Sequence, residues 1–160
     1  PYFLYGYSLN NVKNIIKIVT VSKISIKFAL SKFHILDFAL KGAKNPLNEF
    51  ERKFKKDPYF KSIVKEIQKV KKIKNIPHSK AVKKLGMACS YPGTFNSSIH
   101  SILNSKNYKS AVIKTIKAGG CNCSRLNFIG AYFAALNGIN SIPNSWIKKT
   151  ERANIILKVN

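Results

Sequence analysis

The chain has 160 residues, of which 45% are hydrophobic, so it is long enough to bury one hydrophobic core. Its 29 Lys and Arg residues against 6 Asp and Glu give a formal net charge of +23. No apolar run reaches the roughly 18 residues that a membrane-spanning helix needs, and three cysteines do not suggest a disulfide framework. We therefore expect an intracellular, cytoplasmic protein without a membrane partner.

The positive charge comes almost entirely from lysine, because Arg52, Arg125 and Arg152 are the only arginines. Such a field attracts phosphate-rich polyanions without any sequence preference, so non-specific polyanion binding is expected. Arginine is the residue that contacts phosphates and bases bidentately. Its scarcity favours a lysine-biased, solvated surface, and a basic nucleic-acid-binding module remains the alternative.

The first half of the chain predicts helices that are separated by turn signals. Apolar residues between Ser25 and Gly42 recur at helical spacing, and Gly42 fits the end of that helix. The pairs Asn45-Pro46 and Asp57-Pro58 each predict a helix start, because proline is favoured at the first helical position. The residues expected on the buried faces are Ile24, Phe28, Leu36, Ala39 and Leu40, then Leu47, Phe50 and Phe54, then Phe60, Ile63, Val64, Ile67 and Val70.

The second half of the chain also has helical patterns. Ser79 is a predicted N-cap of a short helix that ends at Gly86, and Thr94 is a predicted N-cap of the next helix. A further helix from Tyr108 leads to two glycines, and an Ala- and Phe-rich helix follows them. No internal repeat is visible, and the sequence therefore predicts an all-α fold, a helical bundle.

Two segments have a functional interpretation beside a structural one. The lysine-rich run from Lys53 to Lys74 has the composition of a basic amphipathic helix for an acidic partner or a membrane surface. Its apolar stripe favours a helix that packs on the core instead. The rings of Tyr2, Phe3, Tyr5 and Tyr7 can stack on bases, and packing at the edge of the core is the favoured interpretation.

The most informative motif is the run Gly119-Gly120-Cys121-Asn122-Cys123-Ser124 at the start of a helix. Two glycines let the backbone turn tightly and bring the following side chains close to whatever occupies the bend. A loop at a helix N-terminus is suited to hold an anion or a metal-bound substrate. Around this run, Cys89 to Phe95 precedes an amphipathic helix, and Gly138 to Pro143 with Trp146 follows the long helix.

This ordered set of motifs, from Ala88 to about Arg152, resembles the closing part of the ADP-ribosylglycohydrolase family. The family signature reads Gly-Gly-Asp-Thr-Asp-Thr/Ser before a small-residue helix, and the exit from that helix reads Gly-x-x-x-Ile-Pro-x-x-Trp. The chain looks most like the eukaryotic branch that contains the jellyfish J-type crystallins, in which the loop commonly reads Asp-Asn-Cys-Ser-Arg. Residues Asn122 to Arg125 fit that variant, and Cys121 departs from it.

The resemblance implies a fold, an activity and a set of site residues. Residues 1–160 would be a single all-α domain with a partial ADP-ribosylglycohydrolase-like fold, forming the C-terminal half of a larger domain. The activity would be hydrolysis of the glycosidic bond between ADP-ribose and a protein side chain, with two magnesium ions activating water. ADP-ribose or an ADP-ribosylated protein would be the partner. The residues that match the family's loop are Gly119, Gly120 and Asn122 on the substrate side and Cys121, Cys123 and Ser124 at the metal positions.

The residues at the metal positions lack the chemistry of the family. Cys121 and Cys123 replace both aspartates, and only Ser124 keeps a hydroxyl. Magnesium requires hard oxygen ligands, whereas thiolates are soft, and no carboxylate side chain occurs between Ile67 and Thr150. We therefore expect a degenerate magnesium site, no magnesium held by this chain, no catalytic residue in it and little or no activity, as in a pseudoenzyme. A non-catalytic structural or interaction protein of the same fold, as in the crystallins, remains the alternative.

The thiols and imidazoles allow other chemistry. Cys121 and Cys123 at a helix N-terminus should have lowered pKa values, and Cys89 and His100 could complete a zinc or iron site with them. Their spacing matches no standard zinc motif, so small residues packed in a loop are the favoured interpretation. His34 is interpreted as a residue of the core or its edge and His78 as a residue of a connection, rather than as catalytic bases.

Overall fold

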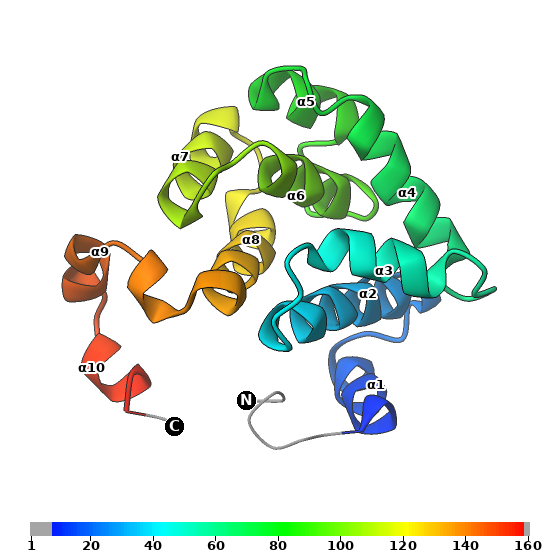
Figure 1. Ribbon diagram of the computed structural model, residues 1–160, viewed down its shortest axis with the longest axis horizontal. Helices are drawn as coiled ribbons and strands as arrows, with labels where there is room; N and C mark the ends of the chain where they lie inside the picture. Colours follow the sequence, from blue (N-terminus) through cyan, green and yellow to red (C-terminus); the bar gives the residue numbers. More distant parts are fainter. Residues whose placement is uncertain (1–7, 159–160) are drawn as a thin grey trace.

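The computed structural model describes residues 8–158 as helices joined by short connections (Figure 1). Within these residues there are ten α-helices, one short 3-10 helix and no strand, so the predicted all-α fold is confirmed. The aromatic cluster Tyr2, Phe3, Tyr5 and Tyr7 lies outside the described residues. The helices are α1 (Leu9–Val19), α2 (Lys23–Leu40), α3 (Pro46–Phe54), α4 (Lys61–Lys72), α5 (His78–Leu85), α6 (Gly93–Leu103), α7 (Tyr108–Ala118), α8 (Asn122–Asn137), η1 (Ile139–Ser141), α9 (Asn144–Lys149) and α10 (Ala153–Ile156).

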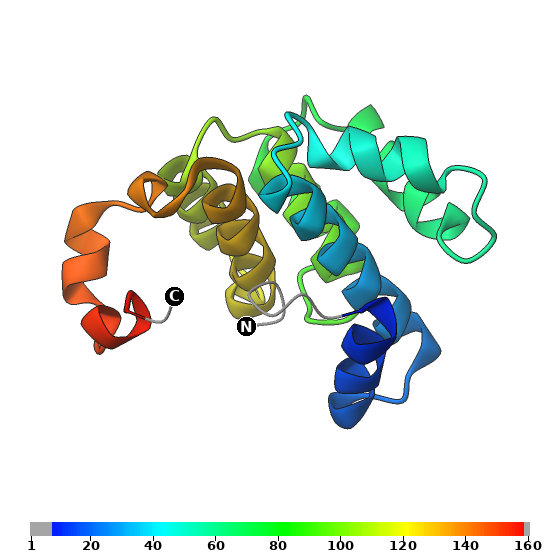
Figure 2. The same ribbon diagram turned by 60° about the horizontal axis from the view of Figure 1, so that its bottom comes forward.

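Helix α6 is surrounded by other helices, and every residue from Gly93 to Ile102 is buried. It packs against α4, α5, α7 and α8, and α8 packs in turn against α2. Figures 1 and 2 both place α1 and the pair α9–α10 at opposite ends of the molecule. None of the helices in residues 8–158 is long and apolar enough to cross a membrane.

The apolar stripes predicted for α3 and α4 form a large part of the core, and all of their residues are buried. The Phe60 ring packs against the rings of Phe50 and Phe54, with centroids 5.8 and 4.7 Å apart. Burying one such side chain stabilises the fold by roughly 1.5–3 kcal/mol. The interpretation of Lys53 to Lys74 as a segment that packs on the core is therefore confirmed.

The buried face predicted for α2 is only partly right. Ile24 and Leu40 are 54% and 51% exposed, and Leu36 is half-buried. Apolar residues occur on most of the circumference of α2, so spacing alone does not select the face that contacts α3 and α8. The apolar residues of α2 that are buried are Ile26, Phe28, Leu30, Ile35 and Ala39.

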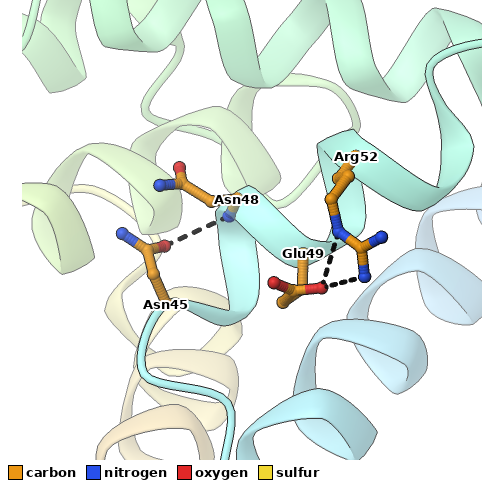
Figure 3. A network of polar contacts seen from close by, with 4 residues as sticks. All are labelled: Asn45, Asn48, Glu49 and Arg52. Atoms are coloured by element: carbon orange, nitrogen blue, oxygen red, sulfur yellow. Dashed lines mark hydrogen bonds and ion pairs between the residues drawn. The ribbon is translucent and has the colours of Figure 1, made fainter.

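The start of α3 agrees with the prediction, and Figure 3 shows its polar contacts. Pro46 is the first helical residue, and the Oδ1 atom of the N-cap Asn45 accepts a hydrogen bond from the Asn48 N–H at 3.1 Å. One turn further along, the Arg52 guanidinium donates to Glu49 Oε2 at 2.7 Å. An exposed pair of this kind contributes only about 0.3–0.5 kcal/mol. The cap and the proline therefore determine where α3 begins.

The start of α4 lies three residues later than the pair Asp57-Pro58 predicts. The Asp57 carboxylate accepts hydrogen bonds from the backbone N–H groups of Tyr59 and Phe60 at 2.8 and 2.9 Å. These bonds hold the intervening residues in a turn, because an Asp side chain can replace a backbone acceptor there. Helix α4 therefore begins at Lys61.

The N-caps predicted at Ser79 and Thr94 are wrong. Helices α5 and α6 begin directly after Pro77 and Pro92, and neither N-cap makes a side-chain hydrogen bond. Ser79 and Thr94 consequently lie inside the first turns of these helices. The proline before each helix limits the backbone to angles compatible with a helix start, which a hydroxyl pattern does not reveal.

Candidate functional site

The motif Gly119–Ser124 lies in the connection between α7 and α8 (Figure 1). Gly119 follows the last residue of α7 with a φ of +72°, and Gly120 has a φ of +75°. Both angles lie in the region that favours glycine. Cys121 is the N-cap of α8, and Asn122 is its first residue. The motif thus lies at a helix N-terminus, as the sequence predicts.

This loop packs directly on the connection between α5 and α6. The Cys121 N–H donates a hydrogen bond to the Met87 carbonyl oxygen at 2.8 Å. A Cβ atom on Gly120 would lie 2.5 Å from that oxygen and 2.9 Å from Met87 Cβ. Only a residue without a side chain fits there, because the packed backbone leaves no room for another carbon. The second glycine therefore allows two connections that are distant in sequence to touch.

Arg125 fixes the loop from the buried side of α8. Its side chain is 1% exposed, and its Nη2 group donates hydrogen bonds to the Gly119 carbonyl oxygen and to Asn122 Oδ1, the latter at 2.9 Å. Burial lowers the pKa of this guanidinium, and its Nε and Nη1 groups have no partner among the described residues. The sequence indicated Arg125 through the family's loop variant, but it gave no signal that the side chain is buried.

The Cys121 thiol contacts two polar side chains. Its Sγ atom lies 3.1 Å from Ser124 Oγ, and the Cys89 thiol of the α5–α6 connection lies close enough to influence its pKa. The contact with Cys89, then those with Ser124 and the positive charge of Arg125, lower the Cys121 pKa to about 7. The direction of this shift agrees with the lowered pKa that the sequence predicts for this thiol. Cys123, on the first turn of α8, is exposed.

The histidines lie in the core rather than beside the thiols. His100 on α6 is buried, and its Nδ1 atom lies 3.0 Å from Nδ1 of His78 on α5. His34 on α2 is buried against Phe54 and Phe60, with ring centroids 4.8 and 5.3 Å away. Within residues 8–158, no three His, Cys, Asp or Glu side chains are arranged to hold a metal ion.

Lys32 is a residue near this region that the sequence did not single out. Its Nζ atom lies 5.2 Å from the ring centroid of Tyr91, in the α5–α6 connection, and 5.4 Å from that of Phe128 on α8. Burial lowers the Lys32 pKa to about 8. Tyr91 also stacks on Phe28 at 4.5 Å, so α2 is joined to this connection. In a chain so rich in lysine, no sequence signal distinguishes Lys32 from the solvated lysines.

The carboxylates that magnesium would prefer are engaged elsewhere. Among residues 8–158, none of their partners belongs to the Gly119–Ser124 loop, and most are lysines or arginines close by in sequence. The pairs are Asp37 with Lys41, Glu49 with Arg52, Glu51 with Lys71, Glu66 with Lys69, and Glu151 with Arg152, while Asp57 accepts from the backbone of Tyr59 and Phe60.

A cavity of about 770 Å³ lies away from the loop, against α1, α2 and α4. Its floor is apolar and includes Ile26, Phe28 and Ile63. Its one acidic residue, Glu66, is bonded to Lys69 and to Asn96. We call this cavity the lysine groove, after the lysines that line it, which are Lys13, Lys17, Lys23 and Lys27.

The sequence of the chain matches a protein-family profile over most of its length. The profile described as ADP-ribosylglycohydrolase matches residues 24–159. The chain belongs to the ADP-ribosylglycohydrolase family. The match covers both connections that meet at Gly120, and the resemblance found in the sequence is confirmed.

Two relatives of this ADP-ribosylglycohydrolase family member are crystallins of Tripedalia cystophora. Crystallin J1A is 39% identical over 93 residues, which are 58% of this chain and 29% of the crystallin. Crystallin J1B is 36% identical over 78 residues, which are 49% of this chain and 24% of the crystallin. The chain thus spans less than a third of the length of these curated relatives.

The Gly119–Ser124 loop of this ADP-ribosylglycohydrolase family member offers two thiols and one hydroxyl as side-chain donors. The Ser124 Oγ atom lies 3.1 Å from the Cys121 sulfur. Soft thiolates do not suit magnesium, which demands oxygen ligands in near-octahedral geometry. The residues present therefore do not fit a magnesium centre, and no hydrolytic step is assigned to them.

Proposed function

We propose that this chain is part of an ADP-ribosylglycohydrolase-like protein whose magnesium site is degenerate and which has little or no hydrolase activity by itself. The observation that carries the proposal is the loop itself. It has two glycines, a helix N-terminus and a contact with Met87, and Cys121 and Cys123 lie at the positions that carry carboxylates in the family signature it resembles. Two-metal hydrolysis depends on several carboxylates that converge on the ions.

On the substrate side, we propose that Gly119, Gly120 and Asn122 contact ADP-ribose or an ADP-ribosylated protein. The start of α8 presents backbone N–H groups and the positive end of a 16-residue helix, which suits a phosphate. The Asn122 Oδ1 atom is held by Arg125, which leaves the Asn122 amide nitrogen as the group that can donate to a ligand.

We further propose that residues 1–160 act as the C-terminal half of a larger domain. The support is the length comparison, because the alignments with the crystallins cover 29% and 24% of those proteins. In that arrangement the remaining metal ligands come from a segment outside this chain. Without such a segment, the chain holds no magnesium.

The test combines a melting experiment with a binding experiment. A ligand that binds only the folded state raises the melting temperature by mass action. Melts with and without millimolar magnesium should coincide, whereas ADP-ribose should raise the melting temperature. Release of ADP-ribose from a modified protein by the chain alone, at a rate that depends on magnesium, would overturn the degenerate-site proposal.

A second candidate function is that of a non-catalytic structural protein, and the crystallin names of the two relatives favour it. The two candidates differ in ligand binding. A structural protein should show no heat of binding with ADP-ribose, and its Asn122→Ala variant should behave like the unaltered chain. A degenerate relative that still recognises the ligand should lose binding on the same change.

A further inference from the structure

Two cysteines that are distant in sequence meet at the contact between the α5–α6 connection and the Gly-Gly loop. Cys89 is exposed and Cys121 is half-buried, and both are free thiols. The Cys89 thiol is the largest influence that lowers the Cys121 pKa, so the two side chains lie close together. The backbone bond from the Cys121 N–H to the Met87 carbonyl oxygen, at 2.8 Å, holds the two segments together just two residues before Cys89.

We propose that Cys89 and Cys121 are a site of reversible oxidation, at which a small-molecule disulfide such as glutathione disulfide links the two thiols. Bridging requires two cysteines that lie close together, and here the hydrogen bond from the Cys121 N–H to the Met87 carbonyl oxygen holds the segment of Cys89 against that of Cys121. Both thiols can be reached from solvent, so the oxidant has access to them. This site is independent of any hydrolase activity.

The chemistry balances without any further reactant. The Cys121 thiolate attacks one sulfur of glutathione disulfide, which forms a mixed disulfide and releases one glutathione. The sulfur of Cys89 then attacks the Cys121 sulfur, loses its proton and displaces the second glutathione. The two protein thiols are oxidised, the glutathione disulfide is reduced to two glutathione molecules, and the two protons of the protein thiols end on them.

Cys123 is not part of this pair. It is one residue from Cys121, and a bridge between residues so close would be strained. Cys123 is exposed on the first turn of α8, whereas Cys121 is the N-cap whose N–H is bonded to Met87, two residues before Cys89. The pair Cys89–Cys121 is therefore favoured over both other pairs.

The bridge would change the candidate site in a defined way. It would tie the α5–α6 connection covalently to the N-cap of α8, where Gly120 and Met87 already touch. Closing a loop of about 30 residues removes conformational freedom from the unfolded chain. The oxidised protein should therefore melt several degrees above the reduced one.

The experiment uses the whole chain with glutathione at a series of oxidised-to-reduced ratios, followed by alkylation and peptide mass spectrometry. The unaltered chain should lose two hydrogens, carry glutathione on Cys123 alone and yield a peptide that links Cys89 to Cys121. The matched control Cys123→Ser should form the same bridge and carry no glutathione. The variants Cys89→Ser and Cys121→Ser should form no bridge and should accumulate mixed disulfides with glutathione.

Two results would overturn the proposal. One is a bridge that persists in Cys89→Ser or Cys121→Ser, because it would have to involve Cys123. The other is an unaltered chain that stops at the mixed disulfide under every ratio. The same reaction in urea keeps the test independent of how well each variant folds. There the Cys89–Cys121 preference should disappear, since it depends on the folded contact.

Discussion

The Nδ1 atoms of His78 and His100 lie 3.0 Å apart between α5 and α6, with their rings stacked at a centroid distance of 5.2 Å. His100 Nε2 lies 3.2 Å from the Ile73 carbonyl oxygen, so this nitrogen must carry a proton to donate. In the neutral form His100 Nδ1 is then an acceptor, and His78 Nδ1 donates to it. His78 Nε2 is left unprotonated and buried, without a partner among the described residues.

This tautomer pair predicts that acid destabilises the fold. Burial, with the neighbouring His100 and then Arg125 and Lys114, lowers the His78 pKa to about 4, and burial lowers the His34 pKa to about 4 as well. Both folded pKa values lie below the ordinary 6.5, so the unfolded chain binds more protons at mildly acidic pH. The free energy of unfolding should fall as the pH drops from 6.5 toward 4, by about 1–3 kcal/mol per imidazole.

The measurement is a set of urea unfolding curves at pH 7, 6 and 5. The variant His34→Phe places a phenyl ring among Phe33, Phe54 and Phe60 and removes one of the three histidines whose pKa is lowered by burial. It should lose part of the pH dependence and keep the part due to His78. An unfolding free energy that is the same at pH 7 and pH 5 would contradict the buried neutral pair.

The second prediction concerns Gly120, where a side chain should be excluded by contact with Met87 as well as by the positive φ angle. Gly120→Ala would place a Cβ atom 2.5 Å from the Met87 carbonyl oxygen. Gly138 has a similar φ of +73° but nothing within 4 Å of its Cβ position, so Gly138→Ala is a matched control. We expect a cost of about 1–2 kcal/mol at Gly138 for the backbone angle. At Gly120 the cost should exceed that by about 2 kcal/mol or more, because packed backbone must move.

Chemical unfolding of both variants measures this difference. Equal costs at the two glycines would show that the α5–α6 connection moves freely away from the loop. In that case the contact between Met87 and Gly120 would not define the geometry of the candidate site.

The third prediction concerns the buried guanidinium of Arg125. Arg125→Lys keeps the charge but replaces a planar fork with one ammonium, which cannot donate to both the Gly119 carbonyl and Asn122 Oδ1 from the same buried position. We expect a loss of about 2–3 kcal/mol, typical of a disturbed buried polar network. Hydrogen exchange at the N–H groups of residues 119–124 should accelerate more than exchange in α4. Uniform acceleration along the chain would mean that Arg125 supports the whole bundle and not this loop.

The sequence predicted the architecture better than it predicted the buried faces and the site contacts. The buried faces predicted for α3 and α4 are confirmed, because each of these helices has one apolar face and a solvated face rich in lysine. The buried face predicted for α2 was partly wrong, because apolar residues cover most of the surface of this helix. Whether Ile24 or Ile26 is buried depends on which helices pack against α2. Burial is decided by tertiary contacts that periodicity does not contain.

The site followed the same division. The Gly-Gly turn and the helix N-terminus were visible in the sequence, because glycine and helix spacing are local signals. The sequence did not reveal the contacts that join segments far apart in the chain. These are the contact of Cys121 with Met87 and Cys89, the burial of Arg125 and the position of Lys32. The N-caps at Ser79 and Thr94 failed for a local reason, which is that a preceding proline starts each helix instead.

The fourth prediction tests whether the positive charge acts at one place. If lysine enrichment is only a property of composition, binding to RNA should be weak, independent of sequence and steeply lost as salt rises. Replacing the four lysines of the lysine groove by glutamine should then weaken binding as much as replacing four exposed lysines elsewhere. Fluorescence titrations at several salt concentrations compare the two sets, and a much larger loss from the groove set would indicate a localised site. The control set is Lys55, Lys56, Lys65 and Lys72.

The fifth prediction restores the family's carboxylates with Cys121→Asp and Cys123→Asp. Asp at the N-cap of α8 can accept a hydrogen bond from the first turn and interacts favourably with the helix dipole, so the chain should gain about 0.5–1 kcal/mol without any metal. The control Cys121→Asn supplies the cap without the charge and should give a similar gain. Neither variant should release ADP-ribose from a modified protein, because two carboxylates and Ser124 cannot enclose two cations.

When a segment that bears the remaining family ligands is supplied by fusion, the double Asp variant should release ADP-ribose in a magnesium-dependent manner, and the native loop should not. Catalysis by two metals requires both ions in a fixed geometry, which one loop alone does not provide. The assay compares the rate of release by the two fusions at equal concentration, with and without a chelator. Equal rates would show that Cys121 and Cys123 are compatible with catalysis, and the argument from ligand softness would then be wrong.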